Sequence, residues 1–256
     1  MKLRTLTWNI GGGKLLEDGK DAGLMSSYVV DGISEIAAQM KAYSPDIVTI
    51  QEAHGSKDDN QVAEIARELG YTHYFYDAIS DSHIDGNYKL GNGLISRFPI
   101  SNIHFGRFLN PEIHFELEGR KAFTHDKGYG SCDIDINGES VHVTSLHLIP
   151  FRSVGLEFES ETAQNILTSV GSELKGSHSY ELIQGDFNIH SQTVRGYLSG
   201  LFISNALDEI ELNEPTTPKS RMYDHVLYHG LKLEKFIVDS DVKTDHYPVI
   251  CDFEIE

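Results

Sequence analysis

The feature that most constrains the fold is the stretch Leu182–His190, which reads LIQGDFNIH. Its apolar start predicts a buried strand, and Asp186 and Asn188 follow at the end of that strand. Residues two apart in an extended chain point to the same side, so we expect a carboxylate and an amide to project together. Gly185 is expected to let the backbone or a ligand come close. A carboxylate in this position is a good oxygen ligand for Mg²⁺, and an amide can hydrogen-bond a phosphoryl oxygen.

A local explanation fits the same two residues equally well. Asp and Asn often form Asx turns, in which the side chain binds the backbone two residues further on. Within this stretch alone, the turn and the ligand site are equally good interpretations. The site gains support because similar polar residues recur at other predicted strand ends.

Six further polar residues lie at the start or end of short apolar segments. They are Asn9, Glu52, His147, Asp224, Asp245 and His246. Taken singly, each has an ordinary explanation, because Asn and Asp are common turn residues and a lone histidine is usually a hydrogen-bonded core residue. Taken together with Asp186 and Asn188, they form an oxygen-rich set with two imidazoles. The set has no cysteine ligand and no His-Glu-x-x-His helix, which favours Mg²⁺ or Mn²⁺ over zinc.

The hydrophobic pattern predicts few helices and many strands. Helical spacing is found at residues 31–43, 62–69 and 156–174, and Asn137-Gly138 is typical of a type I′ hairpin turn. The other apolar segments are short and rich in β-branched residues, as expected for strands. An α/β fold of two packed sheets flanked by helices fits this pattern best, and we expect one domain over residues 1–256.

Net charge limits the kinds of partner. The chain carries 39 acidic and 21 basic residues, with a formal net charge of -18. This balance argues against tight, non-specific binding of duplex DNA, which normally requires a basic face. It favours a small phosphorylated substrate or a short or single-stranded nucleic acid end.

Location is constrained by the N-terminus and by cysteine content. No apolar segment is long enough for a membrane span, and the polar-interrupted start predicts a strand in place of a signal peptide. Cys132 and Cys251 are the two cysteines of the chain. So few cysteines indicate a reducing compartment, and we expect a cytoplasmic protein.

Six short segments occur in an order that is typical of a known superfamily. They are Thr7-Trp8-Asn9, Gln51-Glu52, Ser145-Leu146-His147-Leu148, Gly185-Asp186-Phe187-Asn188, Tyr223-Asp224-His225 and Thr244-Asp245-His246. Through them, nearly the whole chain resembles the endonuclease/exonuclease/phosphatase superfamily of DNase I-like, metal-dependent phosphoesterases. The resemblance implies a four-layered α/β sandwich with the site at one mouth. It also implies that Asn9, Glu52 and Asp245 surround the principal metal ion, Mg²⁺ or Mn²⁺.

The same resemblance implies roles for the remaining residues. Asp186 would orient the attacking water, while Asn188 and His147 would hold phosphoryl oxygens. His246 would act as general base or transition-state stabiliser, and Asp224 would fix its ring. Elementary chemistry agrees, because a cation and hydrogen-bond donors offset the negative charge that keeps hydroxide away from a phosphoester.

Three functions are compatible with these residues. The first is a phosphodiesterase, nuclease-like, that acts on short or single-stranded ends or on a nucleotide. The second is a phosphomonoesterase acting on a small sugar, inositol or nucleotide phosphate. The third is a non-catalytic binding protein on the same fold, which is disfavoured because decayed relatives usually lose metal or base residues.

Branch assignment within the superfamily stays open. Thr244–Val249 is similar to the endings of lipid and inositol branches, and Trp8–Gly11 is similar to the phosphotyrosyl-DNA branch, whose acidic motif differs from Gly-Asp-Phe-Asn. Arg97 is expected to be a solvated or structural arginine and not a phosphate clamp. The aromatic residues at 71–76 are expected to belong to a strand and its core, although they could also stack on a base.

Overall fold

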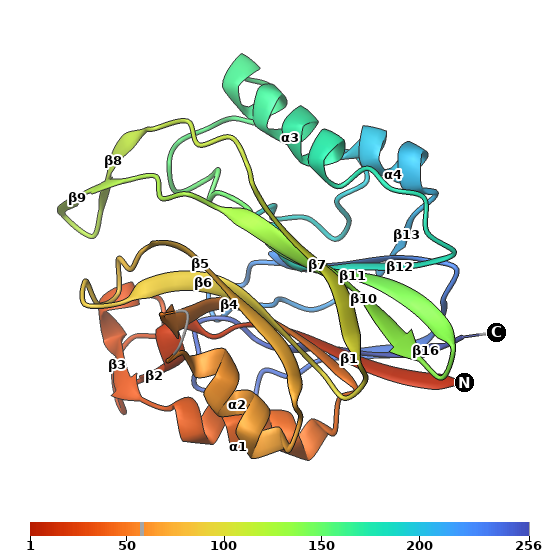
Figure 1. Cartoon of the computed structure of the whole chain (residues 1–256). Coiled ribbons are helices and arrows are strands. Elements are labelled where there is room, and N and C mark those ends of the chain that lie inside the picture. The colour runs from red at the N-terminus through yellow and green to blue at the C-terminus, as the bar shows by residue number, and fades with distance from the viewer. Residues whose placement is uncertain (57–58, 256) are drawn as a thin grey trace.

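The structure is a computed structural model, and it describes residues 1–56 and 59–255 (Figure 1). Two six-stranded sheets lie face to face, and each carries helices on its outer face. Helices α1 (Ile33–Tyr43) and α2 (Gln61–Leu69) cover one sheet, whereas α3 (Glu161–Glu173) and α4 (Ser199–Asn205) cover the other. The predicted four-layered α/β sandwich is therefore confirmed.

The first sheet has the strand order β15-β16-β1-β4-β6-β5. Its strands are β1 (Lys2–Asn9), β4 (Ile47–Gly55), β5 (His73–Asp81), β6 (Lys89–Ser96), β15 (Lys232–Val238) and β16 (Val249–Glu254). Strands β1 and β4 run parallel, and the other neighbours are antiparallel. The parallel pair brings the ends of β1 and β4 to the same edge of the sheet.

The second sheet has the order β13-β14-β12-β11-β10-β7. Its strands are β7 (Ile100–Arg107), β10 (Gly128–Ile136), β11 (Glu139–His147), β12 (Tyr180–Asp186), β13 (Asp208–Glu209) and β14 (Asp224–His229). Strands β11 and β12 run parallel, and β10 and β11 are joined by the predicted hairpin turn, in which Asn137 and Gly138 both have positive φ. The sheet is mixed, like the first.

Two small hairpins extend from one end of the sandwich, at the left in Figure 1. One pairs β2 (Lys14–Leu16) with β3 (Tyr28–Asp31), and the other pairs β8 (His114–Leu117) with β9 (Arg120–Phe123). Two 3₁₀ turns belong to this region: η1 (Gly11–Gly13) precedes β2, and η2 (Met25–Ser27) lies between β2 and β3.

Helices α1, α2 and α3 correspond to the predicted segments, with corrected starts for α1 and α3, whereas α4 was not predicted. Helix α1 begins at Ile33 because Asp31 is paired with Lys14 in the β2–β3 hairpin. Helix α3 begins at Glu161, later than predicted, because the Ser160 side chain caps it by accepting the Ala163 N–H. Across the described residues, no helix has both the length and the apolar character needed to cross a membrane.

A polar layer interrupts the apolar core between the sheets. Gln51 of β4 donates to Ser145 Oγ of β11 at 3.2 Å, and Gln184 of β12 donates to Thr49 Oγ1 of β4 at 3.0 Å. All four side chains are buried. Because buried polar groups need partners, these bonds favour one alignment of the two sheets, just below the strand ends that carry the predicted site residues.

Candidate active site

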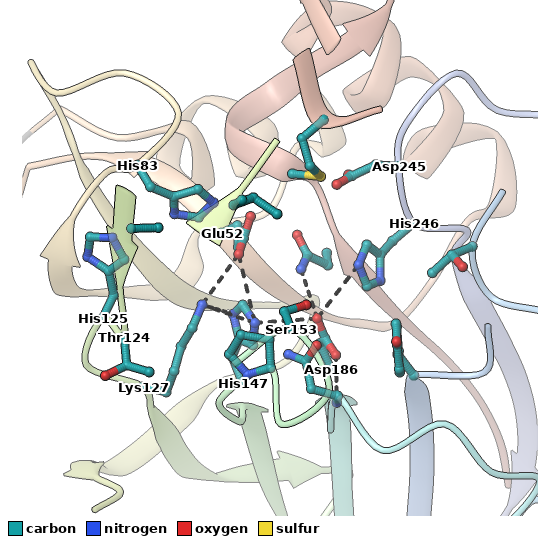
Figure 2. A pocket seen from close by; sticks show the side chains of 18 of the residues that line it. Glu52, His83, Thr124, His125, Lys127, His147, Ser153, Asp186, Asp245 and His246 are labelled. Carbon is teal, nitrogen blue, oxygen red and sulfur yellow. Dashed lines mark hydrogen bonds and ion pairs between the residues drawn. The ribbon is translucent and has the colours of Figure 1, made fainter. Parts of the chain in front are cut away.

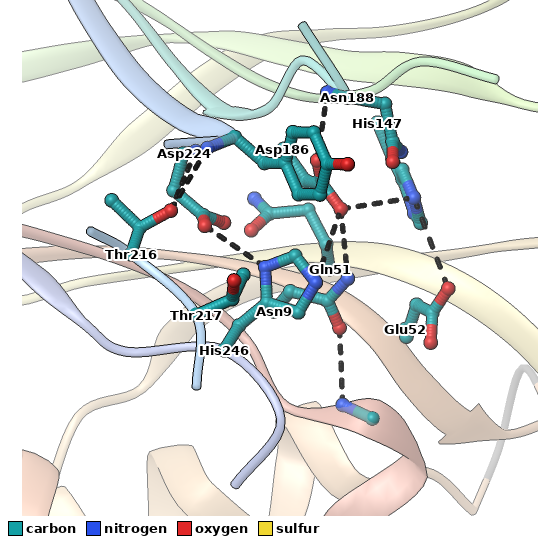
Figure 3. A network of polar contacts seen from close by, with 12 residues as sticks. Asn9, Gln51, Glu52, His147, Asp186, Asn188, Thr216, Thr217, Asp224 and His246 are labelled. Atoms are coloured by element: carbon teal, nitrogen blue, oxygen red, sulfur yellow. Dashed lines mark hydrogen bonds and ion pairs between the residues drawn. The ribbon is translucent and has the colours of Figure 1, made fainter. Parts of the chain in front are cut away.

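Strand register in the second sheet places three predicted residues in one row. His147 at the end of β11 lies opposite Asp186 of the parallel strand β12. Asp186 lies in turn opposite Asp224 of the antiparallel strand β14. Three segments far apart in the sequence therefore present polar side chains at the same edge of the sheet (Figure 3).

Gly185 is required by backbone geometry. Its φ is 151°, and a Cβ at this position would lie 2.0 Å from the carbonyl oxygen of Leu146 on the neighbouring strand. Of the two expected reasons for this glycine, a close approach of backbone is the one observed.

The first sheet contributes Asn9 and Glu52. Asn9 ends β1, and Glu52 lies in a bulge of β4, where pairing with β6 shifts register between Ile50 and Ala53. Glu52 has a φ of 55°, a left-handed conformation that is costly for a residue other than glycine. Bulges re-aim side chains, and here the bulge directs the Glu52 carboxylate toward the cleft.

A third contribution comes from the turn before β16. The Trp8 indole N–H donates to Thr244 Oγ1 at 3.1 Å and to the carbonyl oxygen of His246 at 3.0 Å. Trp8 is fully buried, so it fixes the turn that carries Asp245 and His246 against the end of β1. This contact explains why two motifs from opposite ends of the chain belong to one site.

Asp186 is the centre of the polar network (Figure 3). Its Oδ2 accepts a hydrogen bond from Asn9 Nδ2 at 3.1 Å and lies 3.3 Å from His147 Nε2 and 3.8 Å from His246 Nε2. Its Oδ1 accepts the Asn188 backbone N–H at 2.8 Å, which is an Asx turn. The Asx turn predicted for this stretch is thus confirmed for Oδ1, while Oδ2 faces Asn9, His147 and His246.

His246 and Asp224 form a buried pair. His246 Nδ1 lies 2.9 Å from Asp224 Oδ2. Burial lowers the pKa of His246, but the carboxylates of Asp224 and Asp186 outweigh it and raise the pKa well above its ordinary value. Burial also raises the pKa of Asp186, although the nearby His246 opposes that rise. The imidazole therefore favours its protonated form.

Lys127 is a cleft residue that sequence reasoning missed. Its Nζ lies 3.4 Å from Glu52 Oε1 and within 3.2 Å of both ring nitrogens of His147 (Figure 2). Burial raises the pKa of Glu52, but Lys127 and the nearby histidines outweigh it and lower the pKa overall. A lysine just before a glycine-containing strand matches no motif, so only its place in the fold reveals it.

Seven of the eight predicted residues line one cleft, and Asp224 lies behind His246. The seven are Asn9, Glu52, His147, Asp186, Asn188, Asp245 and His246. Other lining residues that were not predicted include His83, His125, Thr217 and Tyr223. The aromatic residues at 71–76 do not line it, and Arg97 pairs with Asp46 at 3.2 Å, as expected for a structural arginine.

The carboxylates fit a hard divalent cation. Asp245 lines the cleft, and its Oδ1 is buried and has no hydrogen-bond partner among the described residues. Burial raises the pKa of Asp245, and the nearby Glu52 adds to the rise. An unpaired buried oxygen is costly, and a bound cation removes that cost. The oxygen donors and the absence of cysteine among the lining residues suit Mg²⁺ or Mn²⁺.

Comparison with sequence families identifies the fold family. The profile of the Endonuclease/Exonuclease/phosphatase family matches residues 6–246. The chain belongs to this family. A putative neutral sphingomyelinase of Drosophila melanogaster is 24% identical over 227 residues, which cover 77% of this chain and 47% of that protein. The chain described here spans less than half the length of the curated relatives that it matches.

Solved structures show the same fold. An endonuclease/exonuclease/phosphatase protein of Beutenbergia cavernae superposes with a TM-score of 0.73 at 20% identity, covering 99% of this chain and 72% of that one. TDP2 of D. rerio, solved with a single-strand DNA product, gives a TM-score of 0.62 at 14% identity and covers 99% of both chains. Because the sequence identities are only 20% and 14%, these two comparisons show that this protein shares a fold with both structures.

Proposed function

We propose that the protein is a metal-dependent phosphodiesterase. The observation that carries the proposal is the Asp186 network, in which one buried carboxylate oxygen faces Asn9, His147 and His246. Asp245 lines the same cleft, and its Oδ1 has no hydrogen-bond partner among the described residues. The relatives named above include a putative sphingomyelinase and an enzyme solved with a DNA product, and phosphoester chemistry is what they have in common.

Glu52 and Asp245, with Asn9 beside them, would hold Mg²⁺ or Mn²⁺. When bound, such an ion neutralises phosphate charge and lowers the pKa of a coordinated water. The Asn9 side chain is already oriented, because its oxygen accepts the Gly11 N–H at 3.0 Å and its nitrogen donates to Asp186.

Asp186 and His246 would handle the protons and the developing charge. Asp186 Oδ2 is placed to accept a hydrogen bond from the attacking water and so to orient it. Asp224 accepts from His246 Nδ1, which leaves Nε2 directed toward the network. Because its pKa is raised, His246 is suited to donate from Nε2 to a phosphoryl oxygen as negative charge develops.

Lys127, His147 and Asn188 would bind the phosphoryl group. The Lys127 ammonium is held between Glu52 and His147, where it adds positive charge to the floor of the cleft. Asn188 uses its side-chain nitrogen to bind the Leu148 carbonyl oxygen at 2.9 Å, which leaves one amide hydrogen for a ligand. The cleft continues beyond this floor to the β8–β9 hairpin, which leaves room for a second ester group and favours a diester over a monoester.

Partner and location follow from the same properties. We propose a small phosphodiester or a short single-stranded end as substrate, since the net charge of -18 opposes tight binding of duplex DNA. Both cysteines are buried and unpaired, which is consistent with the expected reducing, cytoplasmic environment.

A chromogenic phosphodiester such as bis(p-nitrophenyl) phosphate tests the proposal. We expect turnover with Mg²⁺ or Mn²⁺, loss of turnover in EDTA, and a decrease of about a hundredfold to a thousandfold in kcat/KM for Asp186→Asn. The matched control is Asp208→Asn, an exposed aspartate on β13 of the same sheet. Full activity in EDTA, or an Asp186→Asn variant as active as the control, would contradict the proposal.

A further inference from the structure

The connection between β7 and β10 forms a fixed hairpin at the cleft. At its base, the Phe108 N–H donates to the Lys127 carbonyl oxygen at 2.9 Å, and Thr124 Oγ1 donates to Asn110 Oδ1 at 2.7 Å. At its tip, the Glu118 carboxylate accepts the Met25 N–H at 2.7 Å and that of the next residue at 3.3 Å. The hairpin leaves the second sheet, and its tip is attached to η2, the turn between β2 and β3, so both its base and its tip are held.

One face of this hairpin places three apolar side chains in the cleft, and Arg120, opposite Leu117 on that face, does not line the cleft. Phe115 lies opposite Ala122 in the antiparallel register, so the two side chains share a face, and Leu117 lies on the same face two residues further along. All three line the cleft together with Met25. None of them belongs to the three apolar core clusters of the described chain, and Leu117 is 38% exposed. This apolar surface is therefore available to a ligand.

The chemistry of this surface selects an aliphatic group. The side chains of Phe115, Leu117, Ala122 and Met25 offer no strong hydrogen-bond group, whereas an alkyl chain gains stability by leaving water on contact with them. A nucleobase would bring donors and acceptors on its edges that these four side chains cannot pair. The same cleft, about 220 Å³ in volume, also contains Lys127 and the Asp186 network, so the apolar face and the polar floor would contact one molecule.

We propose that the β8–β9 hairpin forms a subsite for an alkyl or acyl chain attached to the scissile phosphate, so that the substrate is an amphiphilic phosphodiester. This inference rests on the proposed function, since the polar floor would bind the phosphate. The hairpin would contact the alkyl or acyl chain of the substrate beyond the ester oxygen.

Three p-nitrophenyl phosphodiesters with one common leaving group test the inference. Their second ester group is methyl, hexyl or 5′-thymidyl. We expect the hexyl ester to have a kcat/KM about tenfold above that of the methyl ester. A hexyl-to-methyl ratio near one with clear turnover would overturn the inference and leave the proposed function intact. Preference for the thymidyl ester over the hexyl ester would also overturn the inference. It would indicate that this side of the cleft binds a base stacked on Phe123 and His125, whose ring centroids lie 4.6 Å apart.

Variants of the hairpin test where the preference comes from. Phe115→Ala and Leu117→Ala should each lower the hexyl-to-methyl ratio several-fold, toward one. Glu118→Gln weakens the attachment to the Met25 N–H and should lower the ratio less. The matched controls are Glu116→Gln, on the opposite face of the same strand, and Ile103→Ala, an exposed apolar residue of β7. Equal ratios in Phe115→Ala, Leu117→Ala and the controls would overturn the inference.

Binding without turnover separates this inference from the proposed function. Hexylphosphonate and methylphosphonate, titrated by calorimetry in the presence of Mg²⁺, should differ about tenfold in Kd in favour of the hexyl compound. We expect this difference in Kd even if the protein hydrolyses none of the three esters. Equal affinities of the two phosphonates would exclude the alkyl subsite whatever the esters show.

Discussion

Two clusters of histidine and aspartate in this protein have similar composition and different surroundings. One, here called the cleft cluster, consists of Asp186 and His246, which line the cleft, and Asp224 behind them, and the other, here called the distal cluster, consists of Asp133, His142 and His178. Both contain an aspartate next to an imidazole, at 2.9 Å for Asp224 and His246 and at 2.7 Å for Asp133 and His142. The cleft carboxylates are buried, whereas the distal groups are partly exposed.

In the distal cluster, both oxygens of the carboxylate are hydrogen-bonded within the protein. Asp133 uses one oxygen for His142 and the other for Asn102 Nδ2 at 2.8 Å. The rings of His142 and His178 are stacked 4.0 Å apart with an angle of 4° between their planes. Ligand lone pairs lie in the ring plane, so two stacked parallel rings do not point at one ion.

The cleft cluster leaves oxygens unpaired. Asp224 Oδ1 of this cluster is buried without a partner among the described residues, and so is Oδ1 of Asp245, the residue that precedes His246. The two clusters contain the same residue types at similar distances. They differ in whether the carboxylate oxygens have hydrogen-bond partners. A self-contained cluster stabilises the fold, whereas an unsatisfied buried one is prepared for a ligand.

The largest expected difference between the clusters is in catalysis. Asp224→Asn should lower kcat/KM for a phosphodiester about a hundredfold, because the ring of His246 loses its charged partner. Asp224 raises the pKa of His246, so its removal lowers that pKa and should shift the loss of activity at alkaline pH toward neutral pH. Asp133→Asn in the distal cluster is the matched control, measured over the same pH range. A similar loss in both variants would remove the distinction between the clusters.

Metal binding should separate the clusters by an effect on stability. At a Mg²⁺ or Mn²⁺ concentration about a hundred times Kd, linkage adds about 2.7 kcal/mol, which is a rise in Tm of about 5–10 °C. We expect Asp245→Asn to lose most of this rise and His178→Ala to keep it, as measured by thermal unfolding with and without the ion. Loss of the rise in His178→Ala would place the ion in the distal cluster.

The smallest expected effect concerns a buried carboxylate next to the distal cluster. Glu181 lies opposite His142 in the sheet, and both its oxygens accept from Asn205 Nδ2 at about 3 Å. Burial raises the pKa of Glu181, although Asn205 opposes the rise. The folded protein therefore binds this proton more tightly than the unfolded chain, so stability is highest below the ordinary pKa and falls as pH rises.

Glu181→Gln cannot ionise and keeps an oxygen for Asn205. Its free energy of unfolding relative to the parent protein should therefore increase between pH 4 and pH 7, as measured by urea unfolding at several pH values. Glu139→Gln, at an exposed glutamate on the neighbouring strand β11, is the control. A Glu181→Gln variant that becomes relatively less stable with rising pH would contradict the sign.

Much of the fold was predictable because its signals are local. Helix α2 begins at the Asn60 cap and ends at Gly70, and the Asn137-Gly138 turn adopts the positive φ values that its residues favour. The start of α1 was less predictable, since Asp31 is drawn into a hairpin with Lys14 by pairing at a distance. Pairing between distant segments has no local signal.

The order of the motifs was enough to predict which site residues come together. It did not predict which contacts hold them in place. The resemblance places Asn9 and Asp245 together without saying what holds them, and Trp8 does so through two hydrogen bonds from its indole. Lys127 and the apolar face at Phe115 belong to no motif of the sequence. They reach the cleft because of strand register and a long connection, which become visible only in three dimensions.

The β8–β9 hairpin begins and ends at one point of the second sheet, where Arg107 of β7 lies opposite Gly128 of β10. Adjacent strands can be joined by a short loop or a long one without any change in the residues that they pair. Natural variation can therefore resize or replace this excursion while the hydrolytic machinery stays in place. The proposed recognition surface and the proposed hydrolytic residues thus lie on separate segments, and grafting residues 108–126, which leave Lys127 in place, onto a relative is a direct route to a new preference.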